Sequence, residues 1–571
     1  MKFWLILVFV NVIMWIPSYL INFSNQKNPF FFLDLDGYSL KDKVFSFYLR
    51  KASDPFRIHA DFTIAILLFL VLGFTGKIAS AAIGIIGTIS LISMLYGAII
   101  THLFKRMTAL KSDLDFAKVG LVIARKWKYP IILFMLLLSV LFYVGCKYSA
   151  EYLLSFDVEN ILLISGLLVL IPVSFYKPKS MRYYVFRLTF FSGLLHLFYS
   201  YKRGLRYDFI LGKTTDFFKS KNLYKDLELE EKPNIEILCI ESYGSMAWKD
   251  NTIREYMTEM FSKFEKSISE KKLSVASGMS LPPLFAGGSW LSYSTLLFGL
   301  KIDDTAMYKL LFTNDNNFDV YQSLLRWTQK QGYTNFLTNP LKGGYDKDID
   351  WTSVNKNLSP DYFFGWENMD YNGKEFKYLD VGSCPADQYV LHKSKELIMA
   401  KRGNSNVPYT NFYITMNSHY PYSSPVNIVE DWTNLSSNVD YPTTGNGKND
   451  LKNKYKNAIK YQLKSLFDYI LKQDNNDTIY VLFGDHQPPF ITDDNMGLET
   501  PMHIISSNEK LLQPFLEEGF INGLTIKNID GYRIKHEGFL SLFMNGLNSA
   551  YGKKPEKKFE YYSDGIALDK Y

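Results

Sequence analysis

The sequence predicts two parts of different fold class: an α-helical transmembrane N-terminal region, and after it an α/β domain with a mostly parallel central sheet and flanking helices. Two observations lead to this prediction. Residues 1–200 hold almost all of the long apolar runs of the 571-residue chain. Residues 201–571 are more polar, and short apolar runs that suit buried strands alternate there with longer amphipathic segments that suit helices.

Composition excludes several classes of function. The net charge is +6, and no dense stripe of lysine and arginine accompanies it, so we do not expect nucleic acid as a partner. The three cysteines are Cys146, Cys239 and Cys384. Two of them lie in apolar runs and the third in an expected loop, which is the pattern of neither a disulfide framework nor a zinc cluster.

The apolar runs of the first 200 residues predict five or six membrane spans. The expected spans are residues 3–22, a hairpin over 61–104 that is broken near Gly76, and residues 129–148 and 159–176. No small-residue cleavage site follows the first span, so we expect an uncleaved anchor. The segment 183–200 carries Arg187 and His196, and it either spans the bilayer or lies in its interface.

Charge in the loops predicts the orientation. Lysine and arginine are frequent in loops 23–60 and 105–128 and absent from loop 149–158, which favours a cytoplasmic position for the first two. Six spans with an external N-terminus and five spans with an internal one both place residues 201–571 outside the cytoplasmic membrane. We therefore expect a multi-pass protein with an extracytoplasmic C-terminal domain.

A charged stretch, residues 201–232, is expected to link the spans to a domain over residues 233–571. That domain opens with a buried strand over residues 235–240, and Glu241 follows the strand directly. Ligands of open α/β sheets bind beyond the carboxyl ends of the strands, so Glu241 is a candidate binding residue. The alternative is a carboxylate that is simply solvated.

A helical pattern covers residues 252–272, and a second helix is expected from Ser289 onward, behind Gly287 and Gly288. Ser289 therefore lies at or near a helix N-cap. Serine is common at that position without any chemical role. The same place also offers backbone N–H groups and a positive dipole end to a phosphate-like anion, and the paired glycines allow a ligand to approach closely.

The remaining elements are expected as strands over residues 335–339, 409–416 and 478–483, a loop insertion over 430–450 and an amphipathic helix over 449–472. His419 follows the second of these strands, and Asp485 and His486 follow the third. A lone histidine is more often structural than catalytic. An Asp–His pair offers a hard oxygen and a borderline nitrogen to a divalent cation.

In a mostly parallel sheet the polar residues of these segments converge on one edge. They are Glu241, Ser289, His419, Asp485 and His486. A cation held by the two carboxylates and His486 would lower the pKa of the Ser289 hydroxyl and offset charge on a phosphoryl group. His419 would protonate a leaving alkoxide or steady phosphate oxygens.

Four segments give the chain a resemblance to the lipoteichoic acid synthase and phosphoglycerol transferase branch of the alkaline phosphatase–sulfatase superfamily. In the order of that family they are IESYGS (240–245), FAGGSW (285–290), TMNSHYPY (415–422) and LFGDHQPP (482–489). The resemblance implies an alkaline phosphatase/sulfatase-like fold. It also implies one divalent cation at Glu241, Ser289, Asp485 and His486, expected as manganese, with magnesium or zinc as alternatives. The resemblance further implies that Ser289 is the covalent nucleophile and that His419 contacts the substrate phosphate.

The chain departs from the family's pattern at two places. The better-known synthases carry threonine where Ser289 stands. The family also tends to carry a tryptophan with an arginine two residues later that grips phosphoglycerol; Trp351 is the candidate for substrate binding, but Ser353 follows it. A formylglycine-dependent sulfatase would need an arginine in the motif after its Cys or Ser, and Trp-Leu-Ser follows Ser289.

We therefore expect a metal-dependent transferase of the bacterial cytoplasmic (inner) membrane whose catalytic domain faces the periplasm or exterior. It would move a phosphoglycerol-like group from a phospholipid donor, through a phospho-serine at Ser289, to a hydroxyl of an extracytoplasmic glycan or polymer. The alternatives are a phosphoethanolamine transferase and a sulfatase-like phosphodiesterase or hydrolase with water as acceptor. A third alternative is a protein that is not an enzyme, either a membrane scaffold or a transporter whose outer domain has lost activity.

Overall fold

A computed structural model of the chain describes residues 76–104, 128–155, 223–303, 323–342, 360–378, 382–433 and 448–566, apart from residues 404, 426, 474–476, 494–495 and 528, together with single residues and pairs elsewhere. The chain forms two compact units, residues 1–206 and 207–571. The division of the chain into a membrane region (1–200), a linker (201–232) and a catalytic domain (233–571) stays a prediction. Within its linker, Leu227 and Leu229 are buried in the core of the second unit.

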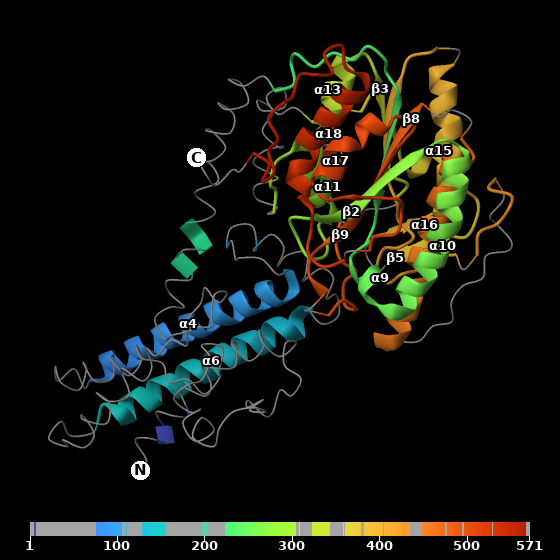
Figure 1. Cartoon of the computed structure of the whole chain (residues 1–571). Coiled ribbons are helices and arrows are strands. Elements are labelled where there is room, and N and C mark those ends of the chain that lie inside the picture. The colour runs from blue at the N-terminus through green and yellow to red at the C-terminus, as the bar shows by residue number, and fades with distance from the viewer. Residues whose placement is uncertain are drawn as a thin grey trace, which may run out of the picture. The chain divides into compact units, whose positions relative to one another are not determined.

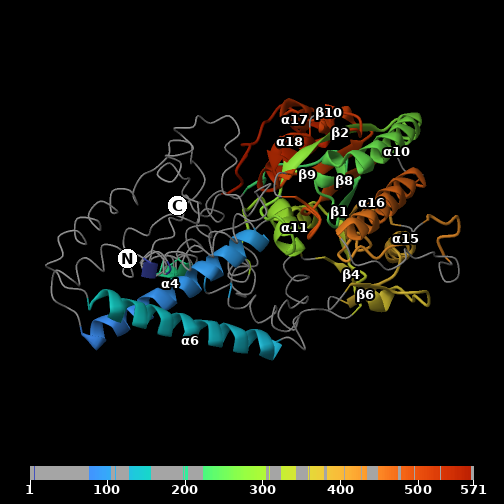
Figure 2. The ribbon, with the colours of Figure 1, turned by 90° about the horizontal axis from the view of Figure 1, so that it is seen from below.

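The first unit contains two long helices that pack side by side, α4 (Lys77–Phe104) and α6 (Lys128–Leu153) (Figures 1 and 2). Of the helices that the structure describes, one is long and apolar enough to cross a membrane, over Lys77–Gly97. α4 begins beside the break predicted at Gly76, and α6 covers the predicted span 129–148. The predicted spans 3–22, 159–176 and 183–200 lie almost entirely outside the described residues, so the number of spans stays a prediction.

The second unit is built on a nine-stranded sheet with the order β10-β2-β9-β8-β1-β7-β3-β4, in which β11 pairs with β2. Its strands are β1 (Asn234–Ile240), β2 (Ser274–Leu281), β3 (Thr334–Thr338), β4 (Tyr362–Phe364), β7 (Tyr409–Ile414), β8 (Thr478–Gly484), β9 (Thr500–Ser506), β10 (Ile521–Asn522) and β11 (Ile534–Lys535). From β8 through β1, β7 and β3 to β4 every pairing is parallel, whereas β9 runs antiparallel to β8 and β2. The predicted fold class is confirmed. A separate antiparallel pair is formed by β5 (Phe376–Tyr378) and β6 (Gly382–Cys384).

Helices cover both faces of the sheet (Figures 1 and 2). On one face lie α10 (Asn251–Glu270), α15 (Asp387–Arg402) and α16 (Lys448–Leu471), with the short α9 (Met246–Lys249) beside them. On the other lie α11 (Ser289–Phe298), α13 (Leu324–Lys330), α17 (Gln513–Glu517) and α18 (His536–Tyr551). Two 3-10 turns cover Trp366–Asn368 and Glu509–Leu511.

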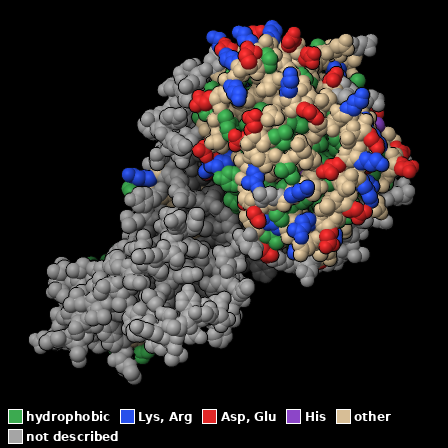
Figure 3. All heavy atoms as spheres, in the orientation of Figure 1, with side chains coloured by type: hydrophobic (Ala, Val, Ile, Leu, Met, Phe, Trp, Pro, Cys, Tyr) green, Lys and Arg blue, Asp and Glu red, His purple; other side chains and the backbone are tan. Residues whose placement is uncertain are grey.

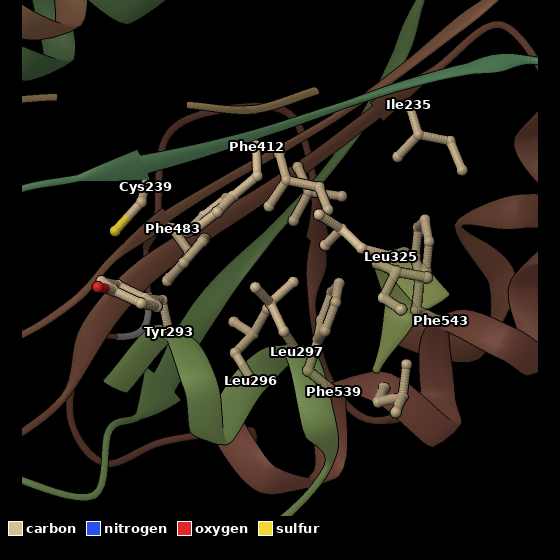
Figure 4. Close-up of a cluster of buried hydrophobic side chains, with 14 of the residues drawn as sticks. Ile235, Cys239, Tyr293, Leu296, Leu297, Leu325, Phe412, Phe483, Phe539 and Phe543 are labelled. Carbon is tan, nitrogen blue, oxygen red and sulfur yellow. The ribbon is translucent and has the colours of Figure 1, made fainter. Parts of the chain in front are cut away.

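The side chains of β1 alternate between two cores, as the twofold repeat of a strand requires. Ile235, Ile237 and Cys239 point into the core beneath α11, α13 and α18. Figure 4 shows that core, where Phe412 and Phe483 from the neighbouring strands meet Tyr293 and Leu297 of α11. Leu238 and Ile240 point into the opposite core, against α10 and α16. A strand covered on both faces is typical of parallel α/β sheets.

Most predicted elements of this unit are confirmed within one or two residues. Two local expectations were wrong. The loop insertion predicted over 430–450 extends too far, because α16 begins at Lys448, within one residue of the start predicted for the helix 449–472. Cys384, expected in a loop, ends strand β6. The expectation that Ser289 lies at or near a helix N-cap is confirmed, because Gly288 is the N-cap of α11 and Ser289 is its first helical residue.

The visible surface of the second unit carries both signs of charge. On the face seen in Figure 3, lysine and arginine side chains alternate with aspartate and glutamate. Neither sign forms a continuous patch on that face. Mixed charge of this kind is the usual surface of a solvated domain.

Candidate active site

The sheet order brings the predicted site residues to one edge. β8, β1 and β7 are adjacent and parallel, and their registers pair Ile240 with Gly484 and Cys239 with Ile414. Glu241 and Asp485 therefore stand one residue beyond the ends of two neighbouring strands. Gly484 makes this close meeting possible: a Cβ atom there would lie 1.9 Å from the carbonyl oxygen of Tyr243.

Three buried ligand-type side chains form a cluster at this edge. Glu241, Asp485 and His486 each offer one atom, and these atoms lie within 4.8 Å of one another. Nε2 of His486 is 3.5 Å from Oε1 of Glu241 and 3.4 Å from Oδ2 of Asp485. The three side chains are at most 4% exposed, so water contributes little to their solvation.

Backbone and hydroxyl groups orient the two carboxylates. Oδ1 of Asp485 accepts hydrogen bonds from the N–H groups of Ser242 (2.8 Å) and His486 (2.7 Å). Oε1 of Glu241 accepts one from the Ser242 hydroxyl at 2.8 Å. Oδ2 of Asp485 is buried and accepts no hydrogen bond from any residue that the structure describes. A buried carboxylate oxygen without a partner is unfavourable unless a cation lies beside it.

The imidazole of His486 is oriented in the way that metal-ligating histidines usually are. Nδ1 lies 2.9 Å from the carbonyl oxygen of Gln487, and since a carbonyl only accepts, Nδ1 carries the hydrogen. In the neutral ring Nε2 therefore keeps its lone pair, on the side of the two carboxylates.

The pKa values of the cluster reflect crowded negative charge. Burial, and then the nearby Glu241 carboxylate, raise the pKa of Asp485. Burial alone would lower the pKa of His486, but the carboxylates of Asp485 and Glu241 outweigh that effect and raise it.

Two carboxylates and an imidazole, with the unpartnered Oδ2, fit a divalent cation. The choice of manganese over magnesium or zinc stays a prediction.

Ser289 joins this cluster as the first residue of α11. Its hydroxyl donates to Oε2 of Glu241 at 3.1 Å and lies 3.2 Å from Nε2 of His486. Gly287 and Gly288 precede it with φ of 69° and 70°, a backbone conformation that favours glycine. The side chain hydrogen-bonds within the site and does not cap the helix, so Ser289 is not an N-cap serine. Its role as the nucleophile stays a prediction.

Neighbouring hydroxyls have other partners. Ser242 donates its hydroxyl to Oε1 of Glu241 and is fully buried. Ser292, one turn after Ser289, is fully buried and donates to the carbonyl oxygen of Asp485 at 2.6 Å. Ser289 is the partly exposed hydroxyl of this group. It is therefore the one that a substrate can reach.

His419 lies at the same edge, beyond the end of β7. Its Nδ1 is 2.7 Å from the carbonyl oxygen of Tyr420, so Nδ1 holds the hydrogen and Nε2 is an acceptor. Burial, reinforced by the nearby His486, lowers the pKa of His419 to about 4. Its expected role, as proton donor to a leaving alkoxide or as a contact to phosphate oxygens, stays a prediction. Nε2 can accept a hydrogen bond from a substrate hydroxyl.

Two hydroxyl residues of the segment that contains His419, Thr415 and Ser418, hydrogen-bond to the backbone of Glu241. Its N–H donates to Oγ1 of Thr415 at 3.0 Å, and its carbonyl oxygen accepts from the Ser418 hydroxyl at 2.6 Å. Both hydroxyl residues are fully buried. They belong to the segment TMNSHYPY, so a reading of that motif beyond its histidine could have found them.

Asp387, the first residue of α15, supports the loop that carries His419. Its Oδ2 accepts from the N–H groups of Met416 (2.9 Å) and Asn417 (2.7 Å), and its Oδ1 accepts from the hydroxyl of Tyr413 at 2.5 Å. In return, Oδ1 of Asn417 accepts from the Asp387 N–H at 2.7 Å. The sequence contains no pattern that singles out Asp387. Trp351, the other predicted substrate-binding residue, lies outside the described residues.

Comparison with known proteins adds a family match. The family model described as sulfatase matches residues 233–517, which is about half of the chain and includes all four motif segments. No curated protein sequence matches the chain.

Three solved structures illustrate the structural neighbours. The integral membrane lipooligosaccharide phosphoethanolamine transferase A of Neisseria meningitidis is 12% identical, with 95% of each chain covered and a TM-score of 0.40. The Streptococcus pyogenes phosphoglycerol transferase GacH, in complex with sn-glycerol-1-phosphate, is 14% identical over 58% of this chain and 80% of its own, with a TM-score of 0.34. The lipoteichoic acid synthase LtaP of Listeria monocytogenes is 14% identical over 50% and 71%, with a TM-score of 0.33.

Proposed function

Because its α/β domain places this chain in the sulfatase family of the alkaline phosphatase–sulfatase superfamily, we propose that it is a metal-dependent transferase that moves a phosphoglycerol-like group from a phospholipid to a hydroxyl of a glycan or polymer. The observation that carries the proposal is the position of Ser289. Its hydroxyl is hydrogen-bonded to Glu241 at the rim of a buried cluster that fits one divalent cation. The transfer then proceeds in two displacements at phosphorus.

In the first displacement the Ser289 oxygen attacks the phosphorus of the donor. A bond from Oγ to phosphorus forms, and the bond from phosphorus to the diacylglycerol oxygen breaks. The Ser289 proton already points at Oε2 of Glu241, so it passes to that oxygen and from there to the departing diacylglycerol. Atoms and protons balance, with diacylglycerol as the released alcohol.

In the second displacement a hydroxyl of the acceptor attacks the same phosphorus. The bond from phosphorus to Ser289 breaks, and the acceptor's proton returns to Ser289 through the same carboxylate oxygen. Nε2 of His419 is left to accept a hydrogen bond, which suits a hydroxyl of the transferred glycerol.

Glu241, Asp485 and His486 would hold the cation, with the Ser289 hydroxyl beside them. When bound, the ion would lower the pKa of that hydroxyl and offset the negative charge of the phosphoryl group. The N-terminus of α11 adds the positive end of the helix dipole at the same place.

The apolar helix α4 supports a membrane location, which gives the enzyme access to a lipid donor. We propose a multi-pass protein of the bacterial cytoplasmic membrane with its catalytic domain on the outer side. The positive charge of loops 23–60 and 105–128 supports that orientation.

Donor identity is tested directly by incubating the purified full-length protein with phosphatidylglycerol or phosphatidylethanolamine labelled in the headgroup. We expect labelled phosphoglycerol on a hydroxyl acceptor and release of diacylglycerol. Label transferred from phosphatidylethanolamine alone would assign a phosphoethanolamine transferase instead. Label released only into water would assign a phosphodiesterase. No turnover of either lipid would contradict the proposal.

A further inference from the structure

Phe490 is an exposed apolar residue in the loop that follows Asp485 and His486. Its side chain is 66% exposed, more than almost any other large hydrophobic side chain that the structure describes in the α/β unit. Its φ is 66°, a left-handed conformation that is uncommon for a residue as bulky as phenylalanine. Phe490 follows His486 by four residues, so the loop that begins with a proposed cation ligand also presents an exposed ring. Backbone outliers of this kind concentrate at functional sites.

A second aromatic ring accompanies Phe490. Tyr420, the residue after His419, lies with its ring centroid 4.7 Å from that of Phe490, and the two planes are tilted by 49°. We call this pair the aromatic lip. The loops that carry His419 and His486 therefore each contribute one ring to the same spot on the surface.

The lip has a rigid support beneath it. Tyr422 is fully buried, and its hydroxyl donates to the carbonyl oxygen of Pro489 at 2.6 Å, which joins the two loops next to the residues that carry the rings. The ring of Tyr422 packs edge-to-face on Tyr420 at 5.7 Å and on Tyr455 of α16 at 5.2 Å. The hydroxyl of Thr492 donates to the carbonyl oxygen of Pro488 at 2.6 Å and closes the second loop. The outward position of Phe490 is thus built into the fold.

We propose that the aromatic lip binds the diacylglycerol end of the phospholipid donor, beside the phosphate ester that Ser289 attacks. This inference rests on the proposed function. In that reaction the bond that breaks joins the phosphorus to an apolar alcohol, so an apolar surface is needed within reach of the nucleophile. A phenylalanine ring has no polar atom and gains free energy when an apolar group covers it.

The test compares two donors that share the reacting phosphate. One is the donor phospholipid in vesicles, with the headgroup that the wild type uses. The other is its deacylated counterpart, glycerophosphoglycerol or glycerophosphoethanolamine. Full-length wild type, Phe490→Ser, Phe490→Leu and the control Tyr532→Ser are assayed with both. Tyr532 is another exposed aromatic residue, 42% exposed, in the loop before β11.

For Phe490→Ser we expect kcat/KM for the phospholipid to fall about tenfold, mainly through KM, because one buried ring contact is lost. Its kcat/KM for the deacylated donor should stay within twofold of the wild type. Phe490→Leu should keep most of the activity with phospholipid, since it remains apolar, and Tyr532→Ser should match the wild type with both donors.

Three results would overturn the inference. Equal losses with both donors would mean that Phe490 supports the loop alone. A change only in the KM for the acceptor would assign the lip to the acceptor, and unchanged kinetics would leave it without a role. Failure of the proposed function would give a different result. The wild type itself would show no Ser289-dependent turnover of either donor. The assignment of the aromatic lip would then be wrong as well.

Discussion

The hydroxyl of Ser289 lies 3.2 Å from Nε2 of His486, although 197 residues separate the two in the chain. A hydrogen bond one helical turn later holds the two segments together. The Ser292 hydroxyl donates to the carbonyl oxygen of Asp485 at 2.6 Å. This hydrogen bond anchors the first turn of α11 to the end of β8. The proposed nucleophile is therefore placed by the fold before any substrate binds.

Replacing Asp485 by asparagine should remove the cation and lower activity at least a hundredfold. An amide cannot supply the negative charge of the unpartnered Oδ2, and the Ser289 hydroxyl would return to the pKa of an ordinary alcohol. Metal content by mass spectrometry and turnover of a labelled donor check this. Asp226→Asn is the matched control, because that carboxylate is an exposed surface partner of Lys557. A variant that retains one ion per chain and full activity would contradict the metal-site assignment.

Asp387→Asn should separate loop support from metal binding. The asparagine amide has one acceptor oxygen where Asp387 uses two, so either the Tyr413 hydroxyl or the N–H groups of Met416 and Asn417 lose their partner. We expect kcat/KM to fall about tenfold and the free energy of unfolding to fall by about 1–3 kcal/mol. Metal content should stay at the wild-type level. Loss of the metal together with activity would show that Asp387 does not act through the His419 loop.

Gly484→Ala should disrupt the site through backbone contact. The new methyl group would lie 1.9 Å from the carbonyl oxygen of Tyr243, so either the end of β8 or the turn after Glu241 must move. We expect a loss of stability on the order of 2–4 kcal/mol together with a loss of metal binding. Gly145→Ala is the control, because a Cβ atom there meets nothing within 4 Å. A Gly484→Ala variant with wild-type melting temperature and metal content would refute the close approach.

Stability should fall in acid because of His503, a buried residue of β9. Burial lowers its pKa to about 3, from an ordinary value of 6.5. Between those values the unfolded chain binds a proton that the folded chain does not, so stability decreases as the pH falls from 6.5 towards 3. The slope is at most about 1.4 kcal/mol per pH unit for one such group. His503→Gln should be less stable at pH 7 yet lose less stability between pH 6.5 and 4. Melting curves across that range check it, and parallel slopes for the two proteins would contradict it.

The strand-end residues could be predicted because periodicity locates buried strands, and parallel strands end at a common edge. That reasoning placed Glu241, Asp485 and His486 correctly without any knowledge of the strand order. The order β8-β1-β7 was not predictable, since it depends on long-range pairing that no local pattern encodes. His419 was placed at the right edge, but its acceptor role follows from the hydrogen bond to the Tyr420 carbonyl, which only the fold creates.

The roles proposed for Asp387 and Phe490 could not be predicted from the sequence. Asp387 stands at an ordinary helix start, and it gains its role from the N–H groups of Met416 and Asn417, some 30 residues later in the chain. Phe490 follows two prolines and reads as one more apolar residue of a loop. Its exposure arises from a left-handed backbone and from the Tyr422–Pro489 hydrogen bond beneath it. Both depend on contacts between segments that local propensity does not describe.

The most direct test of the account is to identify the residue that carries the phosphoryl group during turnover. Full-length enzyme is mixed with the donor lipid, quenched and digested, and the modified peptide is sequenced by mass spectrometry, with Ser289→Ala and Ser289→Thr in parallel. We expect the added phospho group on Ser289, no turnover in Ser289→Ala although the ion is still bound, and measurable turnover in Ser289→Thr, which keeps the hydroxyl. A phospho group on Ser242 or Ser292, or turnover in Ser289→Ala, would contradict the proposed mechanism.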